Sequence, residues 1–142
     1  MALCSWSYSP NDLLHLGHVR YLFKARRLGD FLLVGVNTDQ SVRSYKGPGR
    51  PINPEKDRIE VLAALECVDY AVLFDEPTPL PLIEEIKPDV LVKGMDWKKK
   101  DIAGARQVES WGGKVKRIRL VPGRSSSRLI GELFGKGRAK KR

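Results

Sequence analysis

The chain has few of the side chains that build disulfide frameworks or metal centres. Its 142 residues include two cysteines, Cys4 and Cys67, and two histidines. The cysteines lie far apart in a sequence that starts without a secretion signal, so we expect both to be reduced. Cys67 falls on an apolar helical stripe and is predicted to be a small core residue. A disulfide scaffold is therefore excluded, and no protein ligands to a metal are predicted.

Long apolar runs are also missing. No stretch reaches the ~18 consecutive apolar residues that a membrane span needs. The first residues lack the basic start and the apolar core of a signal peptide. The length suits one domain with a core of its own. We therefore expect a cytoplasmic protein with no membrane partner.

Acidic side chains are outnumbered, since 17 Asp and Glu residues against 26 Lys and Arg residues give a net charge of +9. Five of the basic residues lie in the last eight positions, so we predict a folded domain over residues 1–134 and a disordered basic tail over 135–142. Lys98–Lys100 form a second basic cluster. Neither cluster contains interleaved aromatic residues, so nucleic acid is not the expected partner. Anionic small-molecule substrates account equally well for the excess of positive charge.

Along the chain, segments whose apolar residues recur at helical spacing alternate with short segments that are continuously apolar. Phe31–Val36 is uniformly apolar, as in a strand buried on both faces of a parallel sheet. The order of the elements predicts an α/β, Rossmann-like three-layer sandwich, with a parallel five-stranded sheet and helices on both faces. Strands are predicted over residues 3–8, 31–36, 69–74, 90–92 and 115–121, and helices over 18–28, 39–43, 53–67 (capped by Asn53), 79–86, 102–110 and 128–134.

The only two histidines stand three residues apart at the start of the first predicted helix, in His15-Leu16-Gly17-His18. A helix start offers unpaired N–H groups and the positive end of the dipole, so it attracts phosphate. Gly17 lets the backbone approach a ligand closely. Two imidazoles there could donate hydrogen bonds to phosphate oxygens during group transfer. The alternative is that a histidine simply caps the helix or faces solvent.

Three more polar clusters follow predicted strands or precede predicted helices. They are Asn37-Thr38-Asp39, the loop Lys46-Gly47-Pro48-Gly49-Arg50-Pro51, and Ser125-Ser126-Ser127. The carboxyl ends of parallel strands meet at one edge, so these clusters are expected to converge with the histidines on a phosphate-handling site. Each also has a plain structural reading: Asp39 as a helix cap, the basic loop as surface, and the serines as capping hydroxyls.

These motifs resemble the cytidylyltransferase-like nucleotidyltransferase superfamily and its HxGH fold. The resemblance covers about residues 11–132. It is closest to the adenylyltransferases that make ADP-heptose from heptose 1-phosphate. The stretches that carry it are Asp12–His18, Leu28–Asp30, Val34–Asp39, Lys46–Asn53, Asp57–Asp69, Phe74–Leu80, Pro88–Gly94, Asp101–Ala105 and Leu120–Gly123.

The resemblance implies a reaction in which a sugar 1-phosphate attacks the α-phosphorus of ATP and expels pyrophosphate. No protein nucleophile is needed, because positioning and charge stabilisation carry the catalysis. The implied catalytic residues are His15, His18 and Lys46. The implied nucleotide-binding residues are Asp12, Gly17, His18, Lys93, Gly94, Asp96, Gly123, Ser125, Ser126 and Ser127, and the implied substrate-binding residues are Asn37, Asp39, Lys46 and Arg50.

The resemblance further implies that Mg²⁺ binds with ATP and that the protein forms a homodimer. It also implies a sugar kinase that acts upstream. That kinase is often fused to this domain, but here it is expected to be a separate protein. The chain departs from the family in its first loop, where Ser7–Asp12 lacks the usual glycine and aromatic residue, and at Arg124 and the serine cluster. Two other functions stay open at this point. One is a CTP-dependent cytidylyltransferase for glycerol 3-phosphate or a phospho-alcohol, and the other is a weakly catalytic nucleotide-binding relative.

Overall fold

A single parallel sheet organises the computed structural model, which describes residues 2–5, 13–123 and 126–138. The strands lie in the order β3-β2-β1-β4-β5, and every neighbouring pair runs parallel. Their bounds are β1 (Ala2–Ser5), β2 (Leu32–Asn37), β3 (Tyr70–Phe74), β4 (Val90–Gly94) and β5 (Lys114–Ile118).

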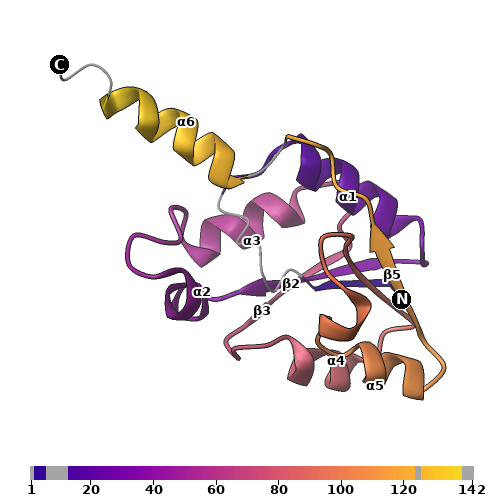
Figure 1. Ribbon diagram of the computed structural model, residues 1–142. Helices are drawn as coiled ribbons and strands as arrows, with labels where there is room; N and C mark the ends of the chain where they lie inside the picture. Colours follow the sequence, from indigo (N-terminus) through magenta and orange to yellow (C-terminus); the bar gives the residue numbers. More distant parts are fainter. Residues whose placement is uncertain (1, 6–12, 124–125, 139–142) are drawn as a thin grey trace.

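Helices cover both faces of the sheet (Figure 1). Helices α1 and α3 lie over one face, α4 and α5 lie over the other, and α6 extends away from the body. The helices are α1 (Leu16–Arg26), α2 (Asp39–Lys46), α3 (Glu55–Ala63), α4 (Leu80–Ile86), α5 (Ala105–Ser110) and α6 (Ser126–Arg138), with a 3₁₀ helix η1 (Lys99–Asp101).

Strand β2 divides the core into two layers, because successive side chains of a strand point to opposite faces. Val34 belongs to the layer under α1 and α3, where it shares a cluster with Leu22 and Leu62. Leu33 belongs to the other layer, with Ile83 of α4 and Val108 of α5. All six residues of β2 are buried, which explains its unbroken apolar sequence. The predicted α/β, Rossmann-like class with parallel strands is confirmed.

Several predicted boundaries are wrong. Helix α3 ends at Ala63 and not at Cys67, because the chain leaves the helix in tight turns whose backbone bonds join Leu65 to Leu62 and Val68 to Leu65. Cys67 is buried, as predicted, but it lies between elements and not on a helix. Burial also raises the pKa of its thiol, which keeps it protonated.

Helix starts and ends differ from the predictions elsewhere too. The N-cap of α3 is Pro54 and not Asn53, and Thr38 caps α2 while Asp39 is its first residue. Helix α2 continues to Lys46, which was predicted to lie in the basic loop. Helix α6 runs from Ser126 to Arg138, four residues beyond its predicted end and into the predicted tail. The predictions for residues 6–8 of the first strand and for 139–142 lie outside the described residues.

In the part of the chain that the structure describes, no helix is both long enough and apolar enough to cross a membrane.

Two glycines with nearly the same backbone conformation allow a matched stability test. Gly104, before α5, has φ +84°, and a Cβ there would lie 2.8 Å from Cδ1 of the buried Ile83. Gly112 has φ +87° and open space around it. We expect Gly104→Ala to lower the free energy of unfolding by about 2–4 kcal/mol, the sum of backbone strain and overpacking. Gly112→Ala should lower the free energy of unfolding only by the backbone strain of a positive φ, about 1 kcal/mol. Urea denaturation measures both, and equal losses would contradict a tight contact at Ile83.

Candidate functional site

The topology of the sheet brings the predicted site residues to one edge. The chain moves from β1 outward to β2 and β3, and then returns to the other side of β1 as β4. In open parallel sheets, ligands bind beyond the carboxyl ends of the strands where the strand order reverses. Here that point lies between β1 and β4. His15 begins the helix that follows β1, and Lys93 and Gly94 end β4, so both predicted groups belong to this point.

His15 and His18 form the N-terminal cap of α1 together. The Nδ1 atom of His15 accepts a hydrogen bond from the Gly17 backbone N–H at 3.0 Å. The Nδ1 atom of His18 accepts from the His15 backbone N–H at 3.2 Å. The two rings stack, with centroids 3.7 Å apart. The capping interpretation of the histidines is therefore correct, and it fixes both rings rather than competing with a role in binding.

The environment of His18 keeps its ring neutral. Burial is the main cause that lowers the pKa of His18 from 6.5 to about 3; the neighbouring His15 lowers it further, and a hydrogen bond to the Leu13 backbone opposes the shift. Because Nδ1 of each ring accepts from the backbone, the neutral form of each ring carries its proton on Nε2. Imidazole N–H and backbone N–H groups at a helix N-terminus are the kinds of donor that suit an anionic ligand.

A buried arginine organises the end of β2. One guanidinium nitrogen of Arg58 donates to the Asn37 backbone carbonyl at 2.9 Å and to the Asp39 carboxylate at 2.8 Å. Its Nε donates to the Asn53 carbonyl at 3.1 Å. The Glu55 carboxylate accepts from the Asp39 backbone N–H at 2.7 Å. Asn37 and Asp39, both predicted to bind substrate, are thus held by α3.

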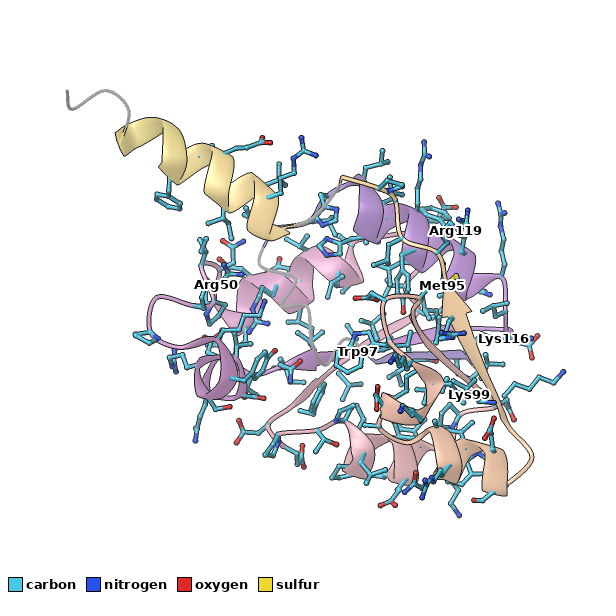
Figure 2. The ribbon with its side chains drawn as sticks, viewed as in Figure 1. Arg50, Met95, Trp97, Lys99, Lys116 and Arg119 are labelled. Carbon is cyan, nitrogen blue, oxygen red and sulfur yellow. The ribbon has the colours of Figure 1, made fainter. Side chains whose placement is uncertain are left out.

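The two basic residues predicted to lie in the loop, Lys46 and Arg50, differ in exposure and in position. Lys46 is exposed at the end of α2, which carries it about 10 Å from Asp39 at ~1.5 Å per residue. Arg50 is half-buried and lies beside α2 and α3, on the opposite side of the molecule from Lys116 and Arg119 near β5 (Figure 2). The positive charge on the β5 side is therefore no part of the predicted site.

The end of β4 forms a second part of the edge. Lys93 is 6% exposed, and its Nζ lies 5.2 Å from the centre of the Trp97 ring. At Gly94 a Cβ would collide with the carboxylate of the exposed Asp96, which would have to move. A cavity of about 400 Å³ opens beside these residues, lined by Asp96, Trp97, Lys98 and Asp101. Sites for small molecules have volumes of this order.

The turn before α6 is fixed by a side chain of that helix. Nη1 of Arg128 donates to the Gly123 carbonyl at 2.8 Å. Ser126 and Ser127 are the first residues of α6, as expected of a cluster at a helix N-terminus. Asp12 and Ser125, also predicted to bind nucleotide, lie outside the described residues, as do the side chains of Ser126 and Ser127.

A magnesium ion on a nucleotide takes most of its ligands from phosphate and water and needs only one or two carboxylates. Within the described ranges, no three His, Cys, Asp or Glu side chains gather as a metal site would require. Asp96 is exposed at the edge next to β4. The donors present therefore fit an ion that arrives with a nucleotide and not one held by the protein alone.

Comparison with known proteins identifies the family of the chain. The family profile described as cytidylyltransferase-like matches residues 11–129. The chain belongs to the cytidylyltransferase-like family. The family predicted from the sequence is thereby confirmed.

Curated members of the family include close relatives. The chain is 56% identical over 119 residues to the "Bifunctional protein HldE" of Syntrophotalea carbinolica, covering 84% of this chain and 24% of that protein. It is 50% identical over 123 residues to the protein of the same name from Geobacter sulfurreducens, covering 87% of this chain and 25% of that protein. The chain thus spans about a quarter of the length of these relatives.

A solved structure has a similar fold. The crystal structure of the lipopolysaccharide core biosynthesis protein from Thermoplasma volcanium GSS1 matches with a TM-score of 0.64 at 30% identity. The match covers 84% of this chain and 93% of that chain.

Sequence reasoning missed two residues that shape this cytidylyltransferase-like site. Arg58 stood out only as part of the family resemblance, because a surface arginine and a buried one look alike in a sequence. Trp97 belongs to none of the motifs that the sequence offers. Its contact with Lys93 depends on the turn after β4, where the Trp97 backbone N–H donates to the Gly94 carbonyl at 3.2 Å.

The lowered pKa of His18 predicts a loss of stability in acid. Between pH 6.5 and about 3 the unfolded chain binds a proton at His18 that the folded chain does not, so stability falls as the pH falls. The contribution is at most about 1.4 kcal/mol per pH unit. His18→Asn keeps an acceptor near Nδ1 but does not titrate. We expect urea denaturation from pH 7 to 4 to show a shallower fall for His18→Asn, and equal slopes would contradict the neutral buried ring.

The Arg58 network predicts a second stability difference. Arg58→Met leaves two carbonyl groups and the Asp39 carboxylate without their donor, and should lower the free energy of unfolding by about 3 kcal/mol. The control is Arg26→Met, whose ion pair with Asp69 has the same 2.8 Å length as the Arg58–Asp39 pair but is about one-third exposed. That variant should lose under about 1 kcal/mol. Thermal or urea denaturation compares the two, and similar losses would contradict the role of burial.

Proposed function

We propose that this chain transfers AMP from ATP to a sugar 1-phosphate, namely heptose 1-phosphate, and releases pyrophosphate. The observation that carries the proposal is the stacked histidine pair, with His18 held neutral, that caps α1 at the point where the strand order reverses. The identity of 50–56% with proteins named HldE supports the heptose as the acceptor.

His15 and His18 would act on the phosphates of ATP. Their fixed Nε2–H groups and the first N–H groups of α1 would bind the α-phosphate region and stabilise the charge that builds up in the transition state. A neutral imidazole donates without first giving up a proton, so the His18 contribution should not change between pH 5 and 9. The sugar phosphate oxygen attacks the α-phosphorus, and the bond to the pyrophosphate oxygen breaks.

The sugar phosphate would lie against the end of β2. Lys46 and Arg50 would neutralise its phosphate, and Asp39 would face the sugar. The predicted substrate residue Asn37 is 2% exposed and its Nδ2 donates to Ser41 Oγ at 3.1 Å, so it would support this end of β2 from inside. Arg58 would act only as a positioning residue, because it holds Asn37, Asp39 and Asn53 in place without being exposed itself. A substrate phosphate placed this way approaches in line with the bond that breaks.

The nucleoside would lie at the end of β4. Lys93, Gly94 and Asp96 were predicted there, and the cavity beside Trp97 gives the base an aromatic wall. The β- and γ-phosphates would bind at the N-terminus of α6, with Gly123 and the Ser125–Ser127 cluster, and Asp12 and Gly17 would complete the nucleotide site. Mg²⁺ bound to the triphosphate would neutralise part of its charge when the nucleotide binds.

Two further roles belong to the proposal. A sugar kinase must supply the 1-phosphate, as a separate protein or as another part of a longer chain, and the relatives are named as bifunctional proteins. The enzyme would work as a homodimer in the cytoplasm, where ATP is at hand.

The deciding experiment measures pyrophosphate release by the purified protein with Mg²⁺. ATP and CTP are each paired with heptose 1-phosphate and with glycerol 3-phosphate. We expect release only with ATP and the heptose. Release with CTP would favour a cytidylyltransferase, and nucleotide binding without any release would favour a non-catalytic relative.

The variant His15→Ala, measured in the same pyrophosphate assay, tests the proposed role of the histidine pair. Loss of its Nε2–H should lower kcat by about 100-fold or more. The variant also loses a helix cap, which should lower the free energy of unfolding by about 1 kcal/mol and leave the protein folded. A His15→Ala protein with near-normal turnover would remove the histidine pair from the mechanism.

A further inference from the structure

Lys93 is a buried cation at the carboxyl end of β4. The residue is only 6% exposed. It shares a face of the sheet with Leu91, because alternate residues of a strand point to the same side. Leu91 packs in the core layer under α4 and α5. The Lys93 side chain is therefore shielded from most of the solvent, and burying its charge is costly unless nearby groups stabilise it.

The aromatic ring of Trp97 supplies such a group. The Nζ atom of Lys93 lies over the ring, 5.2 Å from its centre, which is within the distance at which an aromatic face attracts a cation. Trp97 is half-buried and packs against the same core layer as Leu91. Trp97 also lines the cavity beside β4. The residue thus contacts both the buried ammonium group and the cavity proposed for the nucleoside.

Backbone hydrogen bonds fix the turn that carries Trp97. The Trp97 backbone N–H donates to the Gly94 carbonyl at 3.2 Å and closes the turn directly after β4. The Met95 backbone N–H donates to the Ile118 carbonyl at 2.9 Å, which attaches the same turn to the end of β5. The position of the ring relative to β4 is therefore set by the fold and not by the side chain alone.

A side chain of β5 holds this turn at a further point. Nη1 of Arg117 donates to the Trp97 carbonyl oxygen at 3.1 Å. Arg117 pairs with Lys93 in the register of β4 and β5, so the two side chains leave the sheet on the same face. Arg117 is exposed. It therefore reaches the turn from outside, while Lys93 lies inside beneath the Trp97 ring.

We propose that Trp97 is a positioning residue for Lys93, and that Arg117 holds the turn that keeps the two in contact. The aromatic face stabilises the charged form of Lys93 and keeps the ammonium group at the end of β4, where it acts on the bound nucleotide. The part that concerns the nucleotide rests on the proposed function. The contact between Lys93 and Trp97 does not depend on it.

A double-mutant cycle tests whether Trp97 acts through Lys93. Isothermal titration calorimetry measures the Kd for ATP with Mg²⁺ for the wild type, Trp97→Leu, Lys93→Met and the double variant. We expect Trp97→Leu to raise the Kd by about 3- to 30-fold, the range of a partly desolvated cation–aromatic contact. In the Lys93→Met background the same change should raise it by less than about 2-fold. An equal effect in both backgrounds would mean that Trp97 acts on the base directly, and would overturn the positioning role.

A conservative substitution separates a positioning ring from one that only fills space. Trp97→Phe keeps an aromatic face, whereas Trp97→Leu keeps only an apolar side chain. We expect the Phe variant to bind ATP at least ~3-fold more tightly than the Leu variant. In the pyrophosphate assay, Trp97→Leu should raise the KM for ATP and leave the KM for the sugar phosphate unchanged. Equal losses with Phe and Leu, or a rise in both KM values, would contradict the proposal.

Two neighbouring residues of β5 provide a matched test for Arg117. Arg117→Met and Lys116→Met each remove one positive charge from an exposed side chain, but only the first removes the hydrogen bond to the Trp97 carbonyl. We expect Arg117→Met to raise the Kd for ATP by about 2- to 5-fold and Lys116→Met by less than about 2-fold. Equal effects would show that only the charge of β5 matters and would remove Arg117 from the proposal.

Urea denaturation tests the contact in the absence of a nucleotide. The shifts in midpoint caused by Trp97→Leu and by Lys93→Met should not add in the double variant, because each change removes the same contact. Additive shifts would overturn the contact on which the proposal depends. A wild-type protein that shows this coupling but binds no ATP would refute the proposed function and the role of Lys93 toward the nucleotide, and would leave the Lys93–Trp97 contact standing.

Discussion

Parallel pairing of the short strand β1 with both β2 and β4 is the constraint on which the site depends. Ala2 pairs with Leu32 on one side and with Val90 on the other, so four residues hold the two halves of the sheet in register. The chain leaves β1 in one direction and returns to its other side, which leaves a gap in the covering helices at the carboxyl ends of these strands. The N-terminus of α1 follows β1 and Gly94 ends β4, so the strand order places both at this edge of the sheet.

The hydrogen bonds that cap α1 also fix the chemical state of His15 and His18. The hydrogen bonds that cap α1 use the same Nδ1 atoms that set the tautomer of both rings. Burial and the neighbouring His15 both disfavour a charged His18, so the fold favours the neutral ring at the expense of stability in acid. The fold itself thus holds both rings in place, so in the proposed reaction little reorganisation would be needed to direct donors at a developing charge.

The sequence predicted the parts of this structure that depend on local pattern. The buried run at β2, the helical spacing of α1 and the cluster at the histidines are readable because a strand or helix imposes its own period on the side chains. The predicted helix boundaries were wrong where contacts with residues distant in the sequence determine them. The end of α3 is set by Leu65 and Cys67 turning toward the core, and the first turn of α2 is held by Glu55 and Arg58, which lie more than fifteen residues further along the chain.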